Sequence, residues 1–345
     1  MNDAARVAAT RRLFADVDPA GPGCSAAVFR RGEVVYAEAF GLRQLEPAEP
    51  MTTDTVLDIG STSKQFTATA IGLLALRGAV ELSAPVDTYL PTLASWADDV
   101  TVDNLVHHTS GIPDYVDLLT DLGYSDADVT TDADALSVLS DVAALTFTPG
   151  TSWEYSNSNY FLLGEIVEHV SGSPLPEFLA QEVFAPLDLA MRMEPVADIA
   201  GKAVSYTRSE GAAGWEVADS RWEQVGDGGI QTTPSELVRW ASQYWESTLP
   251  GDSGGLNTLR FREAAVVPGG DGEEYGFGIS RDVDDDGAAV YFHDGSWAGF
   301  ETTFVVAPEQ EIAVAATCSS PEVVPETDGG WGTDLLAAWT QPQQQ

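Results

Sequence analysis

The sequence predicts an α/β fold of the α+β type, in which an antiparallel sheet from both termini is flanked by helices and carries an inserted all-helical lobe. Two observations favour this architecture. Segments with strand-like patterns lie near both ends of the chain, and helical patterns fill the region between them. Apolar residues make up 44% of the 345 residues, which is enough for a large core and argues against global disorder.

The N-terminal part of the chain is expected to form a helix followed by a strand pair. Residues 3–16 are a mixed helical segment that ends at the turn-rich residues 19–23. Residues 25–30 and 34–40 are separated by a short Arg-Gly-Glu turn, as the two strands of a hairpin are.

The middle of the chain has mainly helical patterns. Residues 61–77 are rich in Ala, Leu and Ile and end at Gly78, a residue that commonly terminates a helix. A later helix is expected to start at residues 233–236, where a Ser/Thr cap precedes an acidic first turn. Further helices are expected at residues 102–107, 134–146, 160–170 and 175–184.

The C-terminal part of the chain changes to strands and ends in a helix at residues 333–339. Strands are expected at residues 275–281, 288–293, 301–306 and 312–318, with turns at 282–287, 294–299 and 308–310. We therefore expect an α/β lobe with an antiparallel sheet from residues 1–60 and 225–345, and a mainly helical lobe from residues 61–224. A functional site is expected in the cleft between them.

The composition is strongly acidic. The chain has 54 Asp and Glu against 16 Lys and Arg, which gives a formal net charge of −38. Such a charge repels the phosphates of nucleic acids and anionic lipids, so neither nucleic acid nor a membrane is an expected partner. The only lysines are Lys64 and Lys202. An acidic, lysine-poor surface favours a halophilic setting, where salt screens the repulsion.

The sequence gives no sign of a targeting signal or a transmembrane segment, so we expect a cytoplasmic protein unless an export signal has been removed. Cys24 and Cys318 are too few for a disulfide framework and lack metal-ligand spacing. We expect no metal and no other cofactor. Free buried thiols are the favoured state in a reducing cytoplasm.

The most informative motif is Ser61-Thr62-Ser63-Lys64, at the start of the helix expected from residue 61. Residues three apart share one face of a helix, so the Lys64 amine can approach the Ser61 hydroxyl. A serine becomes a good nucleophile when a base removes its proton, and a buried, neutral lysine can be that base. Taken alone, the motif also fits a capped helix with a surface lysine.

A second motif, Tyr155-Ser156-Asn157, lies in the loop before the helix expected at 160–170. In an extended loop Tyr155 and Asn157 point the same way. A phenol beside an ammonium can relay protons, and an amide can orient a substrate carbonyl. The alternative is an ordinary turn with a packed tyrosine.

A third motif, His293-Asp294-Gly295-Ser296, follows a predicted strand. The edge of a strand can present a backbone N–H as one half of an oxyanion hole, with the Ser61 N–H as the other half. Gly295 allows a substrate to approach the backbone closely. The alternative is a hairpin corner with an exposed histidine.

In their order and spacing, the three motifs resemble those of the serine β-lactamase and penicillin-recognising hydrolase superfamily. The closest resemblance is to its class C-like branch, which includes D-aminopeptidases, DD-carboxypeptidases and family VIII esterases. It runs from about Gly23 to Trp339 and includes residues 105–112, 164–167 and 228–233. The resemblance implies a β-lactamase-like fold, in which the first and last strands pair antiparallel and bring Cys24 and Cys318 close together.

The resemblance also implies a serine hydrolase that forms a covalent acyl-enzyme on an ester or a peptide-like amide, without a metal. Ser61 is then the nucleophile, and Lys64 and Tyr155 shuttle protons. Substrate-binding roles fall to Asn157, to His293 in the place of a lysine of true β-lactamases, and to Asp294, Gly295 and the N–H of Ser296. The expected partner is a small molecule or a short peptide, and the sequence leaves the oligomeric state open.

Asp294 departs from the family pattern, because a hydroxyl residue often binds the substrate carboxylate at this position. If the side chain faces the pocket, it repels β-lactams and C-terminal carboxylates, so esters, amides and amine-bearing peptides fit better. A β-lactamase or DD-carboxypeptidase is the first alternative function, and a non-catalytic relative that binds a ligand in the same cleft is the second. A solvent-facing Asp294 would only add to the surface acidity.

Two other motifs carry weaker interpretations. Gly251–Gly255 spells the active-serine signature of chymotrypsin-like proteases, but those need an all-β double barrel, so a Gly-rich loop is expected. Asp282–Gly287 matches the start of a calcium loop, but His293 stands where the bidentate glutamate belongs, so an acidic hairpin turn is expected. The aromatic residues near the motifs either line the pocket or belong to the core or a lid: Tyr115, Trp153 and Trp297.

Overall fold

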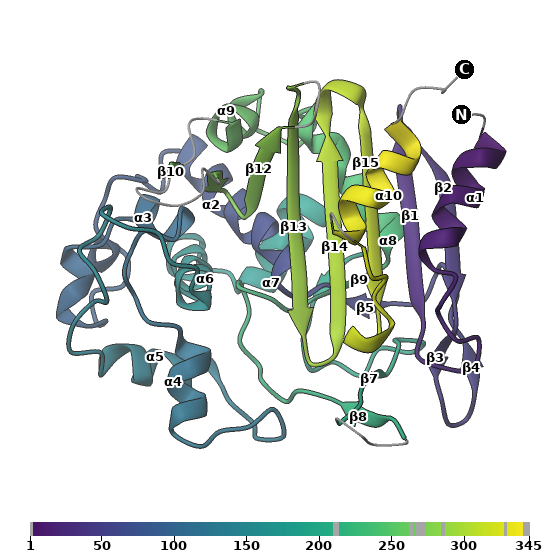
Figure 1. The fold of residues 1–345 in the computed structure, drawn as a ribbon. Coiled ribbons are helices and arrows are strands. Elements are labelled where there is room, and N and C mark those ends of the chain that lie inside the picture. Colours follow the sequence, from purple (N-terminus) through teal and green to yellow (C-terminus); the bar gives the residue numbers. More distant parts are fainter. Residues whose placement is uncertain are drawn as a thin grey trace.

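The computed structural model describes residues 3–209, 214–261, 265–266, 274–283, 287–327 and 330–340. Its centre is an eight-stranded antiparallel sheet in the order β10-β11-β12-β13-β14-β15-β1-β2 (Figure 1). The strands are β1 (Cys24–Arg30), β2 (Glu33–Phe40), β10 (Ala265–Val266), β11 (Glu274–Gly276), β12 (Ile279–Val283), β13 (Ala289–Trp297), β14 (Phe300–Ala307) and β15 (Ile312–Cys318). The predicted fold class, with a sheet built from both ends of the chain, is confirmed.

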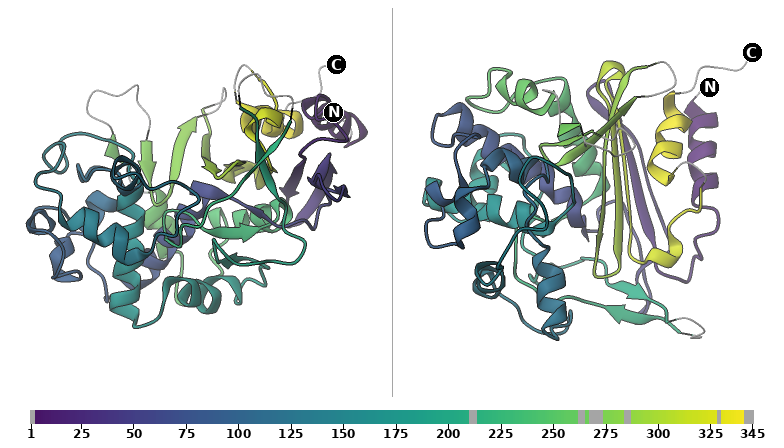
Figure 2. Two further views of the ribbon diagram at one scale, coloured as in Figure 1. Left: turned by 90° about the horizontal axis from the view of Figure 1, so that it is seen from below. Right: turned by 60° about the vertical axis from the view of Figure 1, so that its left-hand side comes forward.

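Helices cover both faces of this sheet. The helices α1 (Asp3–Leu13) and α10 (Trp331–Thr340) lie side by side on one face, and α8 (Pro234–Trp240) lies on the other (Figure 2). The central strands β1 and β15 are therefore buried on both sides. Along β1, Ala27 and Phe29 belong to the core on the α8 side, and Ala26 and Val28 belong to the core under α1 and α10. Burial on both faces explains why these strands are apolar runs without alternation.

The helical part of the chain packs beside the α8 face of the sheet (Figure 1). Its centre is α2 (Lys64–Leu76), which is buried from Lys64 to Leu74. The other helices are α3 (Val102–Val106), α4 (Tyr115–Asp121), α5 (Asp132–Ser140), α6 (Asn157–Ser171), α7 (Leu175–Leu179) and α9 (Gly255–Phe261). Short helical turns are η1 (Gly60–Ser63), η2 (Val86–Thr88), η3 (Ser95–Asp98), η4 (Ala180–Phe184), η5 (Ala241–Tyr244), η6 (Pro308–Gln310) and η7 (Pro321–Val323).

Small sheets connect the helical part to the rest of the chain. The strand β9 (Ile230–Thr232) pairs with both β5 (Leu57–Asp58) and β6 (Arg192–Met193). This sheet joins segments from both sides of the expected boundaries at residues 60 and 225, so the division into two lobes stays a prediction. The remaining pairs are β3 (Leu42–Gln44) with β4 (Glu49–Pro50), and β7 (Ser205–Thr207) with β8 (Glu216–Ala218).

The C-terminal strands differ from the prediction at two turns. The strand expected at 275–281 is interrupted by Phe277 and Gly278, which have φ angles of 52° and 74° and join β11 to β12. The turn expected at 294–299 is shorter, because β13 continues to Trp297 and only Ala298 and Gly299 turn, with φ angles of 44° and 82°. Two-residue turns with positive φ match the twist of a hairpin. The first turn was not expected, and the second is shorter than the turn expected at 294–299.

Three further segments were compared with their expected structures: one helix, the protease-like motif and the calcium-like motif. The helix expected at 134–146 ends earlier, at Ser140, and a capping box of Thr131 and Asp134 starts it. The protease-like segment ends in a turn before α9, where the Asp252 carboxylate accepts a hydrogen bond from the Leu256 N–H at 2.6 Å. Residues 284–286 of the calcium-like motif lie outside the described residues.

Neither a spanning helix nor a metal-binding cluster is present in the part of the chain that the structure describes. None of its helices has the length and apolar character needed to cross a membrane. No group of His, Cys, Asp and Glu side chains there is arranged to hold a metal ion.

Cys24 and Cys318 form a disulfide bond, so the expectation of free thiols is wrong. The two residues are direct partners in the antiparallel pairing of β1 with β15. Side chains of directly opposed residues lie on the same face of a sheet, which brings the two sulfur atoms together. The closeness that the family resemblance implied is present, and the bond joins the first and last strands of the sheet.

We predict that the unfolded protein contains no free thiol before reduction. Titration with a thiol reagent in denaturant is expected to detect the two cysteines only after a reductant is added. The Cys24→Ser, Cys318→Ser double variant is expected to lose about 2–4 kcal/mol of unfolding free energy, because the bridge constrains the unfolded chain. Two reactive thiols in the untreated, denatured protein would contradict the disulfide.

Candidate active site

Ser61 and Lys64 lie where η1 passes into α2, with their polar atoms in contact. Lys64 Nζ donates a hydrogen bond to Ser61 Oγ at 3.0 Å. It also donates to Asn157 Oδ1 at 2.8 Å and to the main-chain oxygen of Asp227 at 2.7 Å. The Lys64 side chain is fully buried, so these three contacts replace the water that an amine otherwise binds. One amine therefore connects three segments that are distant in the sequence.

Asn157 begins α6 and is held on both sides of its amide. Asp114 Oδ2 accepts hydrogen bonds from the main-chain N–H of Asn157 at 2.8 Å and from its Nδ2 at 2.9 Å. Because a carboxylate only accepts, Nδ2 must face Asp114, and the amide oxygen must face Lys64. Asp114 itself caps α4, where its Oδ1 accepts from the Val116 N–H at 2.9 Å. Burial raises the pKa of Asp114.

Tyr155 lies against Lys64 with its ring rather than its hydroxyl. Lys64 Nζ is 4.9 Å from the centre of the Tyr155 ring. The phenol oxygen is buried and has no hydrogen-bond partner among the described residues. The ring packs on His108, with ring centres 4.5 Å apart. A buried hydroxyl without a partner is uncommon in folded proteins and often marks a functional group.

His293 is buried behind the pocket and does not line it. Its Nδ1 contacts the main-chain oxygen of Asp294, and its Nε2 lies 3.0 Å from the Tyr275 hydroxyl. A carbonyl can only accept, so Nδ1 carries the hydrogen and Nε2 accepts from Tyr275. Burial, with the nearby Lys64 amine, lowers the pKa of His293 to about 3. The ring is therefore neutral at neutral pH and cannot replace the charge of a lysine.

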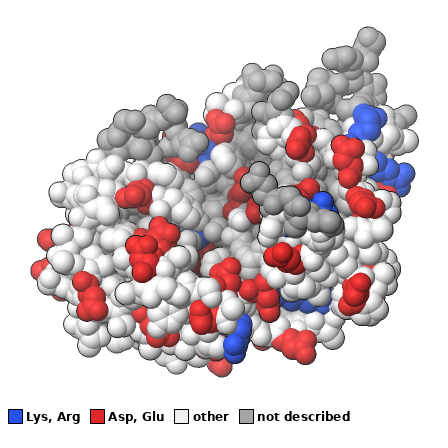
Figure 3. All heavy atoms as spheres, turned by 60° about the horizontal axis from the view of Figure 1, so that its bottom comes forward, with Lys and Arg blue, Asp and Glu red and all other residues white. Residues whose placement is uncertain are grey.

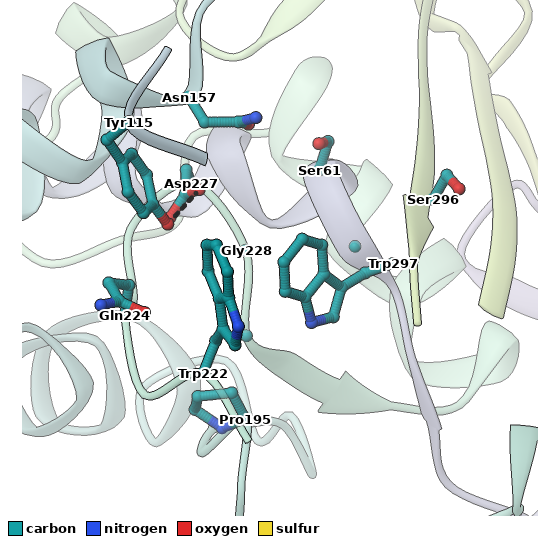
Figure 4. A pocket seen from close by; sticks show the side chains of 12 residues that line it. Ser61, Tyr115, Asn157, Pro195, Trp222, Gln224, Asp227, Gly228, Ser296 and Trp297 are labelled. Atoms are coloured by element: carbon teal, nitrogen blue, oxygen red, sulfur yellow. Dashed lines mark hydrogen bonds between the residues drawn. The ribbon is translucent and has the colours of Figure 1, made fainter. Parts of the chain in front are cut away.

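The side chains of Asp294 and Ser296 lie on the opposite face of β13 from His293 and Gly295, because successive residues of a strand alternate. Asp294 pairs across the sheet with Thr303, whose hydroxyl faces α10. The Asp294 side chain therefore does not line the pocket beside Ser61, and its expected substrate-binding role gains no support from this position. Ser296 Oγ donates to Glu301 Oε1 at 2.6 Å and points away from Ser61 (Figure 4).

The backbone of β13 meets η1 at two glycines. A Cβ atom on Gly295 would lie 2.0 Å from the main-chain oxygen of Ile59, and one on Gly60 would lie 2.8 Å from the Ser296 nitrogen. Gly60 also has a positive φ of 50°. Only glycine permits this approach, which brings the main chain of Ser296 beside Ser61.

A pocket opens beside Ser61, with about 450 Å³ of empty space that includes its opening to solvent (Figure 4). Trp222 and Trp297 stand edge to face in its wall, with ring centres 5.8 Å apart. Tyr115 also lines it, whereas Trp153 does not. The full lining is Gly60, Ser61, Tyr115, Asn157, Pro195, Trp222, Gln224, Asp227, Gly228, Gly229, Ser296 and Trp297.

Two acidic residues of the site, Asp114 and Asp227, were not predicted from the sequence. Both lie next to a recognised segment, and neither belongs to a catalytic motif. The available signal for Asp227 was a lone carboxylate among Gly226, Gly228 and Gly229. Asp227 Oδ2 accepts from the Tyr115 hydroxyl at 3.0 Å, and burial raises the pKa of Asp227 to about 6 against the opposing effect of Lys64.

The chain is similar to proteins of known family over most of its length. A sequence profile of the Beta-lactamase family matches residues 10–338. A D-aminopeptidase of Cereibacter sphaeroides is 30% identical over 299 residues, which make up 85% of this chain and 56% of that protein. The chain thus spans little more than half the length of this relative.

Solved structures have the same fold. The octameric penicillin-binding protein homologue from Pyrococcus abyssi superposes with a TM-score of 0.80 at 27% identity, over 94% of this chain and 75% of that chain. The D-amino acid amidase from Ochrobactrum anthropi SV3 gives a TM-score of 0.78 at 23% identity, over 96% and 98% of the two chains. The expected β-lactamase-like fold is confirmed by these superpositions.

We predict that Gly295→Ala damages both stability and the Ser61 site. The added methyl group must push η1 away from β13, which is expected to cost about 1–3 kcal/mol of unfolding free energy. Denaturant unfolding measures this change. Gly214→Ala is the control, because a Cβ atom there meets nothing within 4 Å. Equal stability of the two variants would show that β13 and η1 do not approach so closely.

Proposed function

We propose that this chain, which belongs to the Beta-lactamase family, is a serine hydrolase that forms a covalent acyl-enzyme on an ester or a peptide-like amide. The observation that carries the proposal is the contact of the fully buried Lys64 amine with the Ser61 hydroxyl at 3.0 Å. A D-aminopeptidase among the relatives supports an amide as the scissile bond.

Acylation begins at Ser61 Oγ. In its neutral form, Lys64 accepts the Ser61 proton while Oγ bonds to the substrate carbonyl carbon. The carbonyl oxygen becomes an oxyanion, and the main-chain N–H groups of Ser61 and Ser296 are the proposed donors to it. The start of α2 adds its positive dipole end at the same place.

Collapse of the tetrahedral intermediate needs a proton for the leaving amine or alcohol. The Tyr155 phenol, whose ring lies 4.9 Å from Lys64 Nζ, is the proposed relay for this proton. The leaving group departs and an ester of Ser61 remains. Water then attacks that ester with Lys64 and Tyr155 as the base, and the acid product leaves with Ser61 restored. Asn157 keeps one N–H of its amide for the substrate, since Asp114 occupies the other.

The alternative functions receive less support from the pocket. β-Lactams and DD-carboxypeptidase substrates carry a carboxylate, whereas the pocket lining contains no Lys or Arg and His293 is neutral. A non-catalytic binder has no need of a buried amine against a serine hydroxyl, because burial of that amine costs free energy. We therefore propose a small molecule or short peptide without such a carboxylate as the substrate.

The cytoplasmic location expected from the sequence stays a prediction. Disulfide bonds persist in oxidising compartments and are rare in the cytoplasm, so the Cys24–Cys318 bond favours an oxidising environment.

Replacement of Ser61 tests the proposed function. Wild-type protein is expected to hydrolyse at least one of a panel of nitrocefin, short-chain p-nitrophenyl esters and a D-alanine anilide, and Ser61→Ala is expected to lower the rate by a factor on the order of 10³ or more. Mass spectrometry after treatment with a fluorophosphonate is expected to place the adduct on the peptide that contains Ser61. Ser253→Ala, in the protease-like segment, is the matched control and should keep full activity.

An adduct at Ser253 would overturn the assignment of the nucleophile. Wild-type protein that neither hydrolyses any substrate of the panel nor reacts with the fluorophosphonate would favour the non-catalytic alternative.

We predict a selective loss of turnover in Tyr155→Phe. Loss of a proton-relay group is expected to lower kcat by about 10²- to 10⁴-fold, while the packing of the ring is kept. Tyr160→Phe is the control, since its ring also lies near Lys64, at 5.9 Å, but its hydroxyl donates to the Val106 carbonyl at 3.0 Å. The control variant should lose stability rather than kcat. Similar kcat values for the two variants would remove the phenol of Tyr155 from the mechanism.

A further inference from the structure

Asp227 is the one charged side chain in the lining of the pocket beside Ser61. The residue is nine-tenths buried, with an exposed fraction of 9%. Its carboxylate faces the Tyr115 hydroxyl in the pocket wall (Figure 4). In the described part of the chain, no Lys or Arg forms an ion pair with this carboxylate. Burial keeps the charged form of this carboxylate costly even with the Lys64 amine nearby, so a cationic group of a ligand would stabilise it further.

The other charged groups near the pocket already have hydrogen-bond partners. Lys64 directs its donors to Ser61, Asn157 and the main-chain oxygen of Asp227. The oxygens of Asp114 accept from Asn157 and Val116, so this carboxylate belongs to the wall. Asp227 also accepts a hydrogen bond, from Tyr115, but it lines the pocket, so it is the acidic group that a substrate can reach.

The position of Asp227 relative to the nucleophile limits which cation fits. Its main-chain oxygen and Ser61 Oγ contact the same amine, at 2.7 Å and 3.0 Å. A substrate carbonyl carbon bonded to Ser61 therefore lies close to the main chain of Asp227. In an amino acid derivative the α-nitrogen is two bonds from that carbon, a separation of about 2.5 Å. An α-ammonium is thus a cation that a short aspartate side chain at this place can reach.

We propose that Asp227 binds the free α-ammonium of the acyl part of the substrate, so that the enzyme acts on aminoacyl esters and amides, including the N-terminal residue of short peptides. This inference rests on the proposed acylation of Ser61. The Tyr115 hydroxyl holds the carboxylate in place, and Trp222 and Trp297 offer aromatic faces to the same cation.

The net charge of the whole molecule also favours a cationic substrate. The net charge of −38 attracts cationic substrates and repels anionic ones over a distance of about 8–10 Å at ordinary salt concentrations. Carboxylates are scattered over the face shown in Figure 3, where Lys and Arg are few. The acidic surface and Asp227 therefore favour the same class of substrate.

Two substrates that differ only in the α-ammonium test this inference. Alanine p-nitroanilide, in both enantiomers, is compared with propionyl p-nitroanilide, which has the same carbon skeleton without the amine. Wild-type protein is expected to prefer the better alanine enantiomer in kcat/KM. Asp227→Asn is expected to lower that preference by about 10- to 100-fold, as for the loss of a hydrogen bond between two charged groups. Circular dichroism and a thermal unfolding curve establish that the variant is folded.

Asp114→Asn is the matched control, because it changes a carboxylate of the same wall that faces Asn157 instead of the pocket. It is expected to slow both substrates by the same factor. If Asp227→Asn also slows both substrates by the same factor, the inference is overturned and Asp227 has only a structural role.

Wild-type protein provides a second test that does not depend on the variant. Hydrolysis of both substrates through Ser61 without a preference for alanine would contradict the inference while leaving the proposed function intact. Turnover that persists in Ser61→Ala would instead reject the proposed function itself.

Discussion

The buried amine of Lys64 is the interaction on which the rest of the site depends. A buried lysine lowers the stability of the fold unless each of its N–H donors has a hydrogen-bond acceptor. Here the acceptors come from η1, from the start of α6 and from the loop before β9. Folding of the helical part is therefore coupled to the placement of that loop, and neither can move without leaving part of the amine unsatisfied.

The polar groups around this amine form a closed circuit. Asp114 accepts from the Asn157 amide, whose oxygen accepts from Lys64. Lys64 donates to the main chain of Asp227, whose carboxylate accepts from the Tyr115 hydroxyl. Asp114 and Tyr115 are neighbours in the chain, so the circuit returns to its start. In a low-dielectric interior such connected hydrogen bonds strengthen one another, and the circuit gives a rigid wall from small, separate residues.

The sequence allowed the general architecture and the contact between Ser61 and Lys64 to be predicted, because both depend on local patterns and spacing. A serine and a lysine three residues apart share a helical face wherever that helix lies. The third motif was harder to interpret. Its strand continues to Trp297, and the resulting alternation turns the side chains of Asp294 and Ser296 away from the pocket, while the main chain of Ser296 still lines it. Which face of a strand is buried depends on its partners, and those lie elsewhere in the sequence.

The position of Asp227 could not be predicted from local sequence either. Its role arises from contacts with Lys64 and Tyr115, which are 163 and 112 residues away in the sequence. Its loop has no regular pattern from which the direction of the side chain follows. The bond between Cys24 and Cys318 likewise depends on the pairing of strands 294 residues apart. Local sequence patterns can suggest such neighbours only through resemblance to a known fold.

The pairing of the first strand with the last has a consequence for the order in which the chain can fold during synthesis. The strand β1 is made early but is sandwiched between β2 and β15, and β15 begins only at Ile312. Until that strand leaves the ribosome, β1 presents one open edge and two apolar faces, a state that is prone to aggregation. The helix α8, which covers one of those faces, is made before that strand. A nascent chain that stalls before residue 312 therefore holds a nearly complete helical part and an unfinished sheet.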